Sequence, residues 1–292
     1  MSAVEQPSGI EHYAAPVALA EALEVLAGGA TVVAGGTDLM VQVEAGAISY
    51  RPTLLNIRRV AELGGIAEEG GRIRIGALAT ITEVLESALL AEKAPALVAS
   101  ADHFASDQIR NAATIGGNVC NASPAGDTIV PLLMLDAEVE LACWQGSVSL
   151  RSVALEDFFT GPGATVKAEN ELLTAISFAR PAAGSVARFT KSGPRPALEI
   201  STVSAGISGV WAGGALTGVR VALGAVAPTP VRARTTEAAL EGKPLDDGVI
   251  AAAAEAALGD CSPIDDVRAS AWYRNHLVQV YIERMLQDVC NS

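Results

Sequence analysis

The stretch DHFASDQIRNAATIGGNVCNASPAGDTIVPLL, residues 102–133, decides how the rest of the chain is interpreted. It has few side chains suited to a hydrophobic core and many that form hydrogen bonds. Gly116 and Gly117 lack a Cβ, so the backbone there can adopt unusual φ and ψ angles and approach a ligand closely. Successive free N–H groups in such a turn form a concavity that suits phosphate oxygens. The polar side chains that accompany this turn are Thr114, Asn118, Asn121, Ser123, Asp127 and Thr128.

A second glycine turn lies much earlier in the chain. Residues 32–40, VVAGGTDLM, run from a short apolar strand through Gly35-Gly36-Thr37 into the start of a helix. Strand, glycine-rich turn and then a hydroxyl is the order that presents backbone N–H groups to a phosphate. The stretch is neither a Walker motif, because no Gly-Lys-Ser/Thr follows, nor Gly-x-Gly-x-x-Gly. One Gly-Gly pair is typical of an ordinary loop, but two such turns favour a single ligand with a long diphosphate spine.

FAD fits that ligand better than a mononucleotide does. If the two turns grip one dinucleotide from opposite lobes, Gly36 and Gly116 must face a shared crevice. The sequence therefore predicts a cleft between two lobes of the fold.

Composition limits the classes of function. The chain has 292 residues, half of them hydrophobic, which is enough for two or three domains with sizeable cores. The net charge of −13 argues against partners such as nucleic acid or an anionic membrane surface. No apolar run approaches the ~20 residues that span a bilayer. Residues 1–6 lack the pattern of a secretory signal, so we expect a cytoplasmic location.

The cysteine and histidine residues do not predict a metal site. None of the four cysteines belongs to a Cys-x-x-Cys pair, which excludes a self-contained zinc ribbon and the usual iron–sulfur runs. The three histidines are too dispersed to form a metal site. Cys120 is the one cysteine inside the stretch 102–133. It packs behind the turn or lies near the ligand, and the sequence leaves both interpretations open.

Hydrophobic periodicity predicts an α+β fold. Residues 16–28 form a helix, residues 31–34 and 54–57 form strands, and together they make a small βαβ-like lobe. Alternation over 66–79 predicts a hairpin, and Thr80 with Glu83 has the spacing of a capping box. Further strands are expected at 137–142, 147–153, 171–179, 187–190, 201–210 and 218–223, and further helices at 95–100, 232–240, 248–258 and 269–289. With a linker at 181–184, the predicted domains are residues 1–58, 59–180 and 185–292.

Two motifs in this order resemble a known family. AGGTDL at 34–39 together with QIRNAATIGGN at 108–118 resembles the FAD-binding medium subunit of molybdenum hydroxylases, the family of xanthine dehydrogenase and carbon monoxide dehydrogenase flavoproteins. The resemblance covers nearly the whole chain and continues through 122–127, 159–163, 189–191 and 271–274. It implies a two-lobed FAD-binding fold of the PCMH type, followed by a C-terminal domain of antiparallel sheet plus helices.

The resemblance also implies a division of labour among subunits. A large subunit carries a molybdenum cofactor and hydroxylates substrate, and a small subunit carries two [2Fe–2S] clusters. The present chain binds FAD and passes electrons to NAD⁺, oxygen or another acceptor, in a dimer of heterotrimers. The flavin does the redox chemistry, and the protein supplies binding, orientation and electrostatics. The sequence leaves open which substrate is hydroxylated and which acceptor is used.

By the same resemblance, the cofactor contacts divide between the two turns and a few later residues. The first turn contributes Val33, Ala34, Gly35, Gly36, Thr37, Asp38 and Leu39. The second lobe contributes Thr114, Ile115, Gly116, Gly117, Asn118 and Ser123. Asp127 accepts hydrogen bonds from ribityl or adenosine hydroxyls, and Leu172 packs on the dinucleotide. Lys191 lies near the pyrimidine edge of the flavin, where a cation stabilises the anionic reduced ring.

Other interpretations remain at two of these residues and for the function. Asp127 also has the position of a helix N-cap before residues 129–132, and Lys191 that of a solvated charge at a strand end. A stand-alone FAD-dependent oxidoreductase is a second hypothesis for the function, although no cluster of His or Tyr offers a substrate base. The third is a non-enzymatic nucleotide-binding module.

Overall fold

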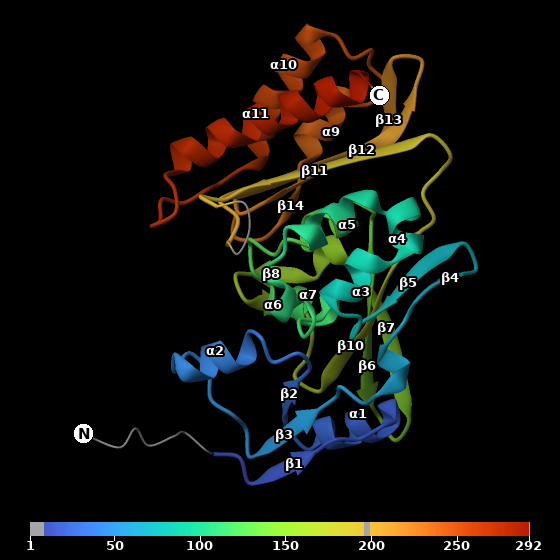
Figure 1. Ribbon diagram of the computed structural model, residues 1–292, viewed down its shortest axis with the longest axis vertical. Coiled ribbons are helices and arrows are strands. Elements are labelled where there is room, and N and C mark those ends of the chain that lie inside the picture. Colours follow the sequence, from blue (N-terminus) through green and yellow to red (C-terminus); the bar gives the residue numbers. More distant parts are fainter. Residues whose placement is uncertain (1–8, 196–198, 292) are drawn as a thin grey trace.

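The computed structural model describes residues 9–195 and 199–291. Residues 1–8, 196–198 and 292 lie outside this range, and the prediction about a secretory signal at residues 1–6 falls on them. The molecule is elongated, with an N-terminal lobe at one end, a middle region, and a C-terminal region at the other end (Figure 1). No helix among the described residues combines the length and the apolar character needed to cross a bilayer. The cytoplasmic location stays a prediction.

The N-terminal lobe is a small parallel βαβ unit, as predicted. Its sheet has the order β1-β3-β2, with both pairs parallel. The buried face of α1, which includes Leu23 and Leu26, packs with Leu55 of β3. The elements are β1 (His12–Ala14), α1 (Leu19–Ala27), β2 (Thr31–Val33), α2 (Leu39–Glu44) and β3 (Thr53–Asn56).

The middle region is built on a five-stranded antiparallel sheet of order β4-β5-β10-β6-β7. Its strands are β4 (Ile66–Glu69), β5 (Arg72–Gly76), β6 (Glu138–Trp144), β7 (Val148–Ala154) and β10 (Glu171–Ala179). Short 3-10 turns, η1 (Ala61–Leu63) and η2 (Leu155–Asp157), and a hairpin of β8 (Phe159–Gly161) with β9 (Ala164–Thr165) complete the connections. The predicted strands and hairpin are thereby confirmed, with shifts of up to three residues at their ends.

Six short helices between β5 and β6 cover this sheet. They are α3 (Ile81–Glu86), α4 (Ala88–Lys93), α5 (Pro95–Asp102), α6 (Asp107–Arg110), α7 (Ile115–Asn121) and α8 (Ile129–Met134). The predicted capping box begins α3, because the Glu83 N–H donates to Thr80 Oγ1 at 3.1 Å and the Thr80 N–H donates to Glu83 Oε2 at 2.7 Å. These two bonds satisfy N–H groups that have no partner within the helix.

More residues of the stretch 102–133 lie in the hydrophobic core than its composition predicted. Its polar residues stand at helix starts, where the side chains of Ser106 and Thr114 accept from N–H groups of α6 and α7. All six residues of α8 are buried, and Ile115 and Val119 of α7 are fully buried as well. The expectation of few core side chains here was therefore wrong, because the short apolar runs between the caps enter the core.

The C-terminal region is a four-stranded antiparallel sheet of order β11-β12-β13-β14 with helices on one face (Figure 1). Its elements are β11 (Ser185–Ser192), β12 (Val203–Ala212), β13 (Ala215–Gly224), β14 (Val231–Arg232), α9 (Arg234–Leu240), α10 (Asp247–Ala256), η3 (Ala257–Asp260) and α11 (Ala271–Cys290). The sheet and α9 to α11 share one core, which includes Val221 and Ile282. The other face of the sheet packs on α5 and α8 of the middle region. The predicted strands and the three predicted helices are confirmed.

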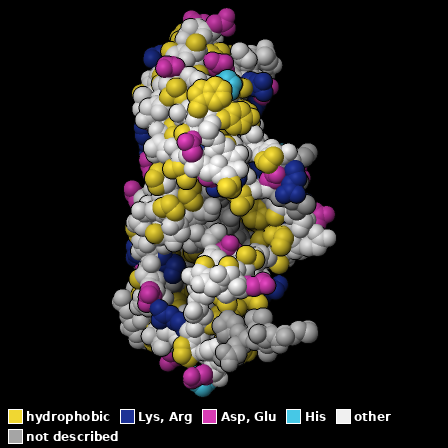
Figure 2. Space-filling model, turned by 90° about the vertical axis from the view of Figure 1, so that its left-hand side faces the viewer, with side chains coloured by type: hydrophobic (Ala, Val, Ile, Leu, Met, Phe, Trp, Pro, Cys, Tyr) yellow, Lys and Arg dark blue, Asp and Glu magenta, His cyan; other side chains and the backbone are white. Residues whose placement is uncertain are grey.

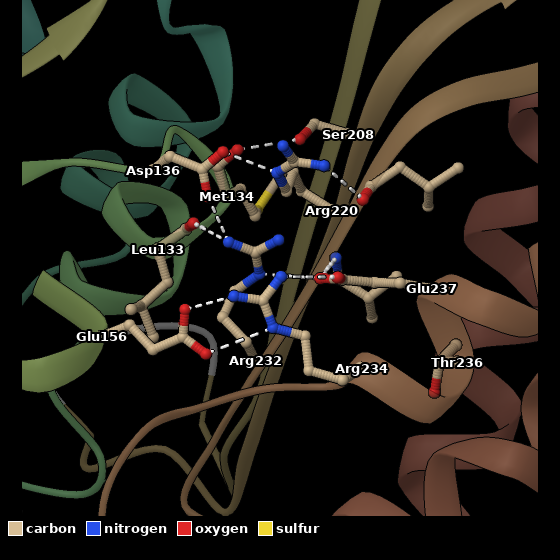
Figure 3. Close-up of polar contacts among 12 residues, drawn as sticks. Leu133, Met134, Asp136, Glu156, Ser208, Arg220, Arg232, Arg234, Thr236 and Glu237 are labelled. Atoms are coloured by element: carbon tan, nitrogen blue, oxygen red, sulfur yellow. Dashed lines mark hydrogen bonds and ion pairs between the residues drawn. The ribbon is translucent and has the colours of Figure 1, made fainter. Parts of the chain in front are cut away.

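Ion pairs join the middle and C-terminal regions. Asp136 accepts from Arg220 Nε at 2.6 Å and also pairs with Arg232, whose side chain is almost completely buried (Figure 3). Glu156 pairs with Arg234 in the same cluster. Burial raises the pKa of Asp136, but hydrogen bonds and charge from the two arginines outweigh burial and hold that pKa below its ordinary value. The cluster fixes the C-terminal sheet against α8.

Candidate functional site

A cleft of about 490 Å³ lies between the N-terminal lobe and the middle region. It opens toward the face shown in Figure 2, where the surface is hollowed between the lower lobe and the body above it. Gly36 and Gly116 both line the cleft, as the sequence predicted. The start of β10 forms part of its wall. The volume lies within the range of known cofactor and ligand pockets.

The cleft brings together most of the residues that the resemblance implied. The lining includes Ala34, Gly35, Gly36, Thr37, Asp38, Leu39, Thr114, Gly116, Gly117, Asn118 and Leu172. Five of the expected residues are not in this wall, namely Val33, Ile115, Ser123, Asp127 and Lys191. Ile115 is fully buried in the core, and the Ser123 hydroxyl accepts from the Ala125 N–H at 3.2 Å.

The first glycine turn offers free donors to the cleft. Within the described part of the chain, the N–H groups of residues 35–38 have no acceptor. Gly36 has a φ of 75°, a left-handed conformation that glycine adopts without steric cost. Such an arc of unpaired N–H groups suits an anion.

Gly35 serves a different purpose from Gly36. A Cβ at Gly35 would lie 2.0 Å from the carbonyl oxygen of Ala112, which belongs to the middle region. Glycine is therefore required for the two lobes to approach this closely. Residue 35 sets the separation of the cleft walls.

The backbone N–H groups of the second glycine motif are already hydrogen-bonded within the chain. The N–H of Ile115 donates to Ala79 O at 2.9 Å, and that of Gly116 to Ala77 O at 3.0 Å. The N–H of Gly117 donates to Thr114 Oγ1 at 3.1 Å. Neither of these two glycines has a positive φ. The expected concavity of free N–H groups was therefore wrong here, because these donors are used to hold α7 in place.

Close packing explains Gly116. A Cβ at this position would lie 2.7 Å from both the Cβ and the carbonyl oxygen of Ala77. The residue lets α7 lie directly on the chain that follows β5. The binding capacity of this motif resides in its side chains.

Asn118 is the side chain of α7 best arranged for a ligand. The fully buried Thr128 hydroxyl donates to Asn118 Oδ1 at 2.7 Å. This bond fixes which end of the amide is the acceptor, so the two Nδ2 N–H donors are left for the cleft. A second contact spans the lobes, since Gln42 Nε2 of α2 donates to Asn121 Oδ1 of α7 at 3.2 Å.

Sequence reasoning missed Phe104, which lines the cleft beside Ala105 and Ile109. Ala105 has a φ of 39°, which is uncommon for a residue with a Cβ and turns the chain between α5 and α6. A lone aromatic residue in a polar stretch gave no periodic signal. Its ring provides an apolar face for a planar ligand.

Asp127 and Lys191 form a buried ion pair. Lys191 Nζ lies 2.7 Å from Asp127 Oδ2 and also donates to the carbonyls of His103 and Glu199. The Ser201 hydroxyl donates to Asp127 Oδ1 at 2.6 Å. Burial raises the pKa of Asp127, and the ion pair with Lys191 offsets this only in part. The N-cap interpretation of Asp127 was wrong, since no side chain caps α8, and so was the solvated interpretation of Lys191.

Cys120 both packs behind the second glycine turn and lies at the cleft, the two positions that the sequence left open. Its side chain packs against the core of the middle region and also lines the cleft. Burial raises the pKa of its thiol to about 11. The group is therefore an uncharged thiol at neutral pH, and thiolate chemistry is not available to it.

The cleft between two glycine turns, followed by a region of antiparallel sheet and helices, places the chain in a class of flavoproteins. Residues 7–181 match the family model described as the FAD binding domain in molybdopterin dehydrogenase, and residues 188–289 match the CO dehydrogenase flavoprotein C-terminal domain. The chain belongs to the FAD-binding medium subunits of molybdenum hydroxylases. It is an oxidoreductase subunit.

Individual relatives match along nearly the whole chain. The xanthine dehydrogenase FAD-binding subunit of Escherichia coli O157:H7 is 34% identical over 280 residues, with 94% of each chain covered. The carbon monoxide dehydrogenase medium chain of Hydrogenophaga pseudoflava is 30% identical over 277 residues, covering 94% of this chain and 95% of the relative. The solved carbon monoxide dehydrogenase from that organism superposes with a TM-score of 0.89, at 30% identity over 94% of this chain and 95% of that one. Quinoline 2-oxidoreductase from Pseudomonas putida 86 superposes with a TM-score of 0.88, at 28% identity over 96% of both chains.

The cleft fits the cofactor of this family. FAD is a long molecule with an anionic centre and two planar apolar ends. The free N–H groups of residues 35–38 suit the centre. Apolar side chains suit the ends, with Ile57, Leu78 and Leu172 beside the N-terminal lobe and Phe104 beside α6.

Proposed function

We propose that FAD lies in this cleft with its diphosphate against the N–H groups of residues 35–38. The adenosine half then packs against Leu172 and Ile57, and the isoalloxazine ring against Phe104. The orientation is supported by the Asp127–Lys191 pair. Lys191 donates to the carbonyl of His103, the residue before Phe104, so the pair lies behind that end of the cleft. A polar environment there suits the flavin better than the adenine.

The expected site residues outside the cleft wall have indirect roles in this proposal. Val33 and Ile115 shape the strand and helix that carry the two turns. Ser123 and Asp127 follow α7 and support the flavin half of the cleft from behind its wall. Lys191 tunes the flavin through its charge, which Asp127 moderates. Bound FAD supplies the electron-transfer chemistry, while the chain binds, orients and shields it.

We propose that the chain is the FAD subunit of a three-component molybdenum hydroxylase. It takes electrons from the [2Fe–2S] clusters of a small partner subunit and passes them to an external acceptor such as NAD⁺. A large partner subunit holds the molybdenum cofactor, and the assembly is a dimer of heterotrimers. Relatives named as medium chains of carbon monoxide and glyceraldehyde dehydrogenases support this. The observation that carries the proposal is the single cleft that joins both glycine motifs.

The domain division 1–58, 59–180 and 185–292 is part of the proposal. Three separate hydrophobic cores support it. One surrounds Leu23 and Leu55, one surrounds Ile115 and Phe178, and one surrounds Val221 and Ile282.

Copurification tests the proposed function. The tagged chain, expressed in its native host, should retain two further subunits, one containing molybdenum and one containing [2Fe–2S] clusters. Substrate added to the complex should reduce the FAD, whereas the chain purified alone should bind FAD and show no reduction by the same substrate. Substrate oxidation by the isolated chain would contradict the proposal and favour a stand-alone oxidoreductase.

A further inference from the structure

One side chain of the described cleft wall is cationic. Lys167 follows β9 and lines the cleft together with Cys120, Glu171 and Leu172. Among the described residues of the cleft wall, it is the one lysine, and no arginine accompanies it. The residue lies far from both glycine motifs in sequence, and no pattern pointed to it.

The ammonium group of Lys167 is available to a ligand. Its Nζ donates to the carbonyl oxygens of Ala168 at 3.1 Å and Glu171 at 3.3 Å, which are both uncharged acceptors. It forms no salt bridge with any described carboxylate. Because an ammonium group has three N–H donors, one remains free.

The nearby carboxylate of Glu171 is already engaged. Arg151 binds it through two parallel contacts, Nε to Oε1 at 2.6 Å and Nη2 to Oε2 at 2.8 Å, and the Ala168 N–H donates to it at 2.7 Å. The hydrogen bond from Arg151 is the largest cause that holds the pKa of Glu171 below its ordinary value. Arg151 is therefore the main partner of Glu171, and the charge of Lys167 makes only a smaller contribution to the lowered pKa.

The N–H groups of residues 35–38 offer the diphosphate hydrogen bonds, but no described residue of the cleft wall other than Lys167 offers it a cationic side chain. The whole chain has a net charge of −13, and the carboxylate of Asp38 is itself part of the wall. The second glycine motif gives no free backbone N–H, as described above. Lys191 is committed to Asp127 behind the cleft.

Lys167 also lies on the side of the cleft where the ADP half is expected. It hydrogen-bonds the first residue of β10, and the next residue, Leu172, packs in the core of the N-terminal lobe with Leu55 and Ile57. We infer that Lys167 binds the ADP half of FAD, with its ammonium against the diphosphate. This inference rests on the proposed cofactor position.

Calorimetric titration of the flavin-free full-length chain tests this. The ligands are FAD, ADP, adenosine and riboflavin. The variants are Lys167→Gln, Lys167→Arg and, as a control, Lys243→Gln, which removes an exposed charge in the C-terminal region. Lys167→Gln should weaken ADP binding about tenfold, as expected for loss of a charge-assisted contact, and leave adenosine and riboflavin unchanged. Lys167→Arg should restore ADP binding to within about threefold, and Lys243→Gln should match the wild type.

Each other outcome has a distinct meaning. Unchanged ADP affinity in Lys167→Gln, or an equal loss for ADP and adenosine, would overturn the inference. Failure of Lys167→Arg to restore ADP binding, with an unchanged melting temperature, would do the same, because it would show that charge is not what matters. A wild-type chain that binds neither ADP nor FAD would instead contradict the proposed function.

Discussion

Lys191 Nζ lies 2.7 Å from Asp127 Oδ2, and both side chains are almost completely withdrawn from solvent. The two residues belong to different regions of the molecule, Asp127 to the segment before α8 and Lys191 to β11. Each charge is tolerated in this place because the other is present. The pair therefore joins the C-terminal sheet to the Phe104 end of the cleft.

Removing one charge of this pair should lower the free energy of unfolding more than removing both charges does. Lys191→Met leaves Asp127 buried without its counter-charge, so we expect a loss of about 3–5 kcal/mol in the free energy of unfolding. The double variant Asp127→Asn, Lys191→Met should lose less than half as much. Urea denaturation of the flavin-free chain at neutral pH measures both. With Asp127→Asn measured alone as well, a double-variant loss equal to the sum of the two single losses would show that the pair is not coupled.

The Asp136 cluster should make stability depend on pH. The pKa of Asp136 is lowered in the folded protein, so its contribution is present above the unfolded pKa of about 3.9 and is lost as pH falls through the folded value. Asp136→Asn should reduce the free energy of unfolding by about 1–3 kcal/mol at pH 7, allowing for its half-exposed carboxylate. The difference in free energy of unfolding between Asp136→Asn and the wild type should be the same at pH 5 as at pH 7. It should shrink below about pH 3.9.

A surface pair provides the control for Asp136. Asp288 pairs with Arg188, but its side chain is 63% exposed. Asp288→Asn should change the free energy of unfolding by less than about 1 kcal/mol, because solvent screens such pairs. An equal cost at both positions would contradict a special role for the cluster between the two regions.

Gly35 sets how closely the two lobes approach. Gly35→Ala places a Cβ 2.0 Å from a backbone oxygen of Ala112, and neither backbone can yield cheaply. We expect a loss of about 1–3 kcal/mol in stability and at least a tenfold weaker FAD affinity, measured by fluorescence titration. Gly259→Ala is the control, since a Cβ there meets no atom within 4 Å. An FAD affinity unchanged by Gly35→Ala would show that the wall separation does not govern binding.

Much of the fold was predictable because its signals are local. The βαβ order around Leu23, the capping box at Thr80 and the alternation along β5 each depend on neighbouring residues. The two glycine turns predicted a shared cleft for the same reason. The N–H of Gly116 was misjudged because its acceptor, Ala77 O, lies on a distant segment that becomes a partner only after the chain folds. The N–H of Gly117 was misjudged because the local N-cap at Thr114 was overlooked.

The missed residues belong to contacts between distant segments. Phe104 and Lys167 reach the cleft from connections whose sequences carry no periodicity. The Asp127–Lys191 pair spans two regions of the chain. No pattern within a short window specifies such pairs, so the polar interior of the site had to come from the structure.

Thr128 should act on the cofactor through Asn118. Thr128→Val keeps the shape of the side chain but removes the hydroxyl that donates to Asn118 Oδ1. The amide is then free to rotate, and we expect a cost of about 1 kcal/mol, or roughly a fivefold rise in the Kd for FAD. Thr128→Ser keeps the hydroxyl and should bind FAD like the wild type. Equal affinity in the valine and serine variants would exclude this positioning role.

The position of the bound cofactor is the central claim, and a crystal structure of the chain with FAD tests it most directly. We expect the diphosphate against the N–H groups of residues 35–38, the isoalloxazine ring beside Phe104 and the adenosine half beside Leu172. A cofactor found elsewhere would contradict this account. The clearest such case is the groove of about 710 Å³ between residues 92–97 and 181–187.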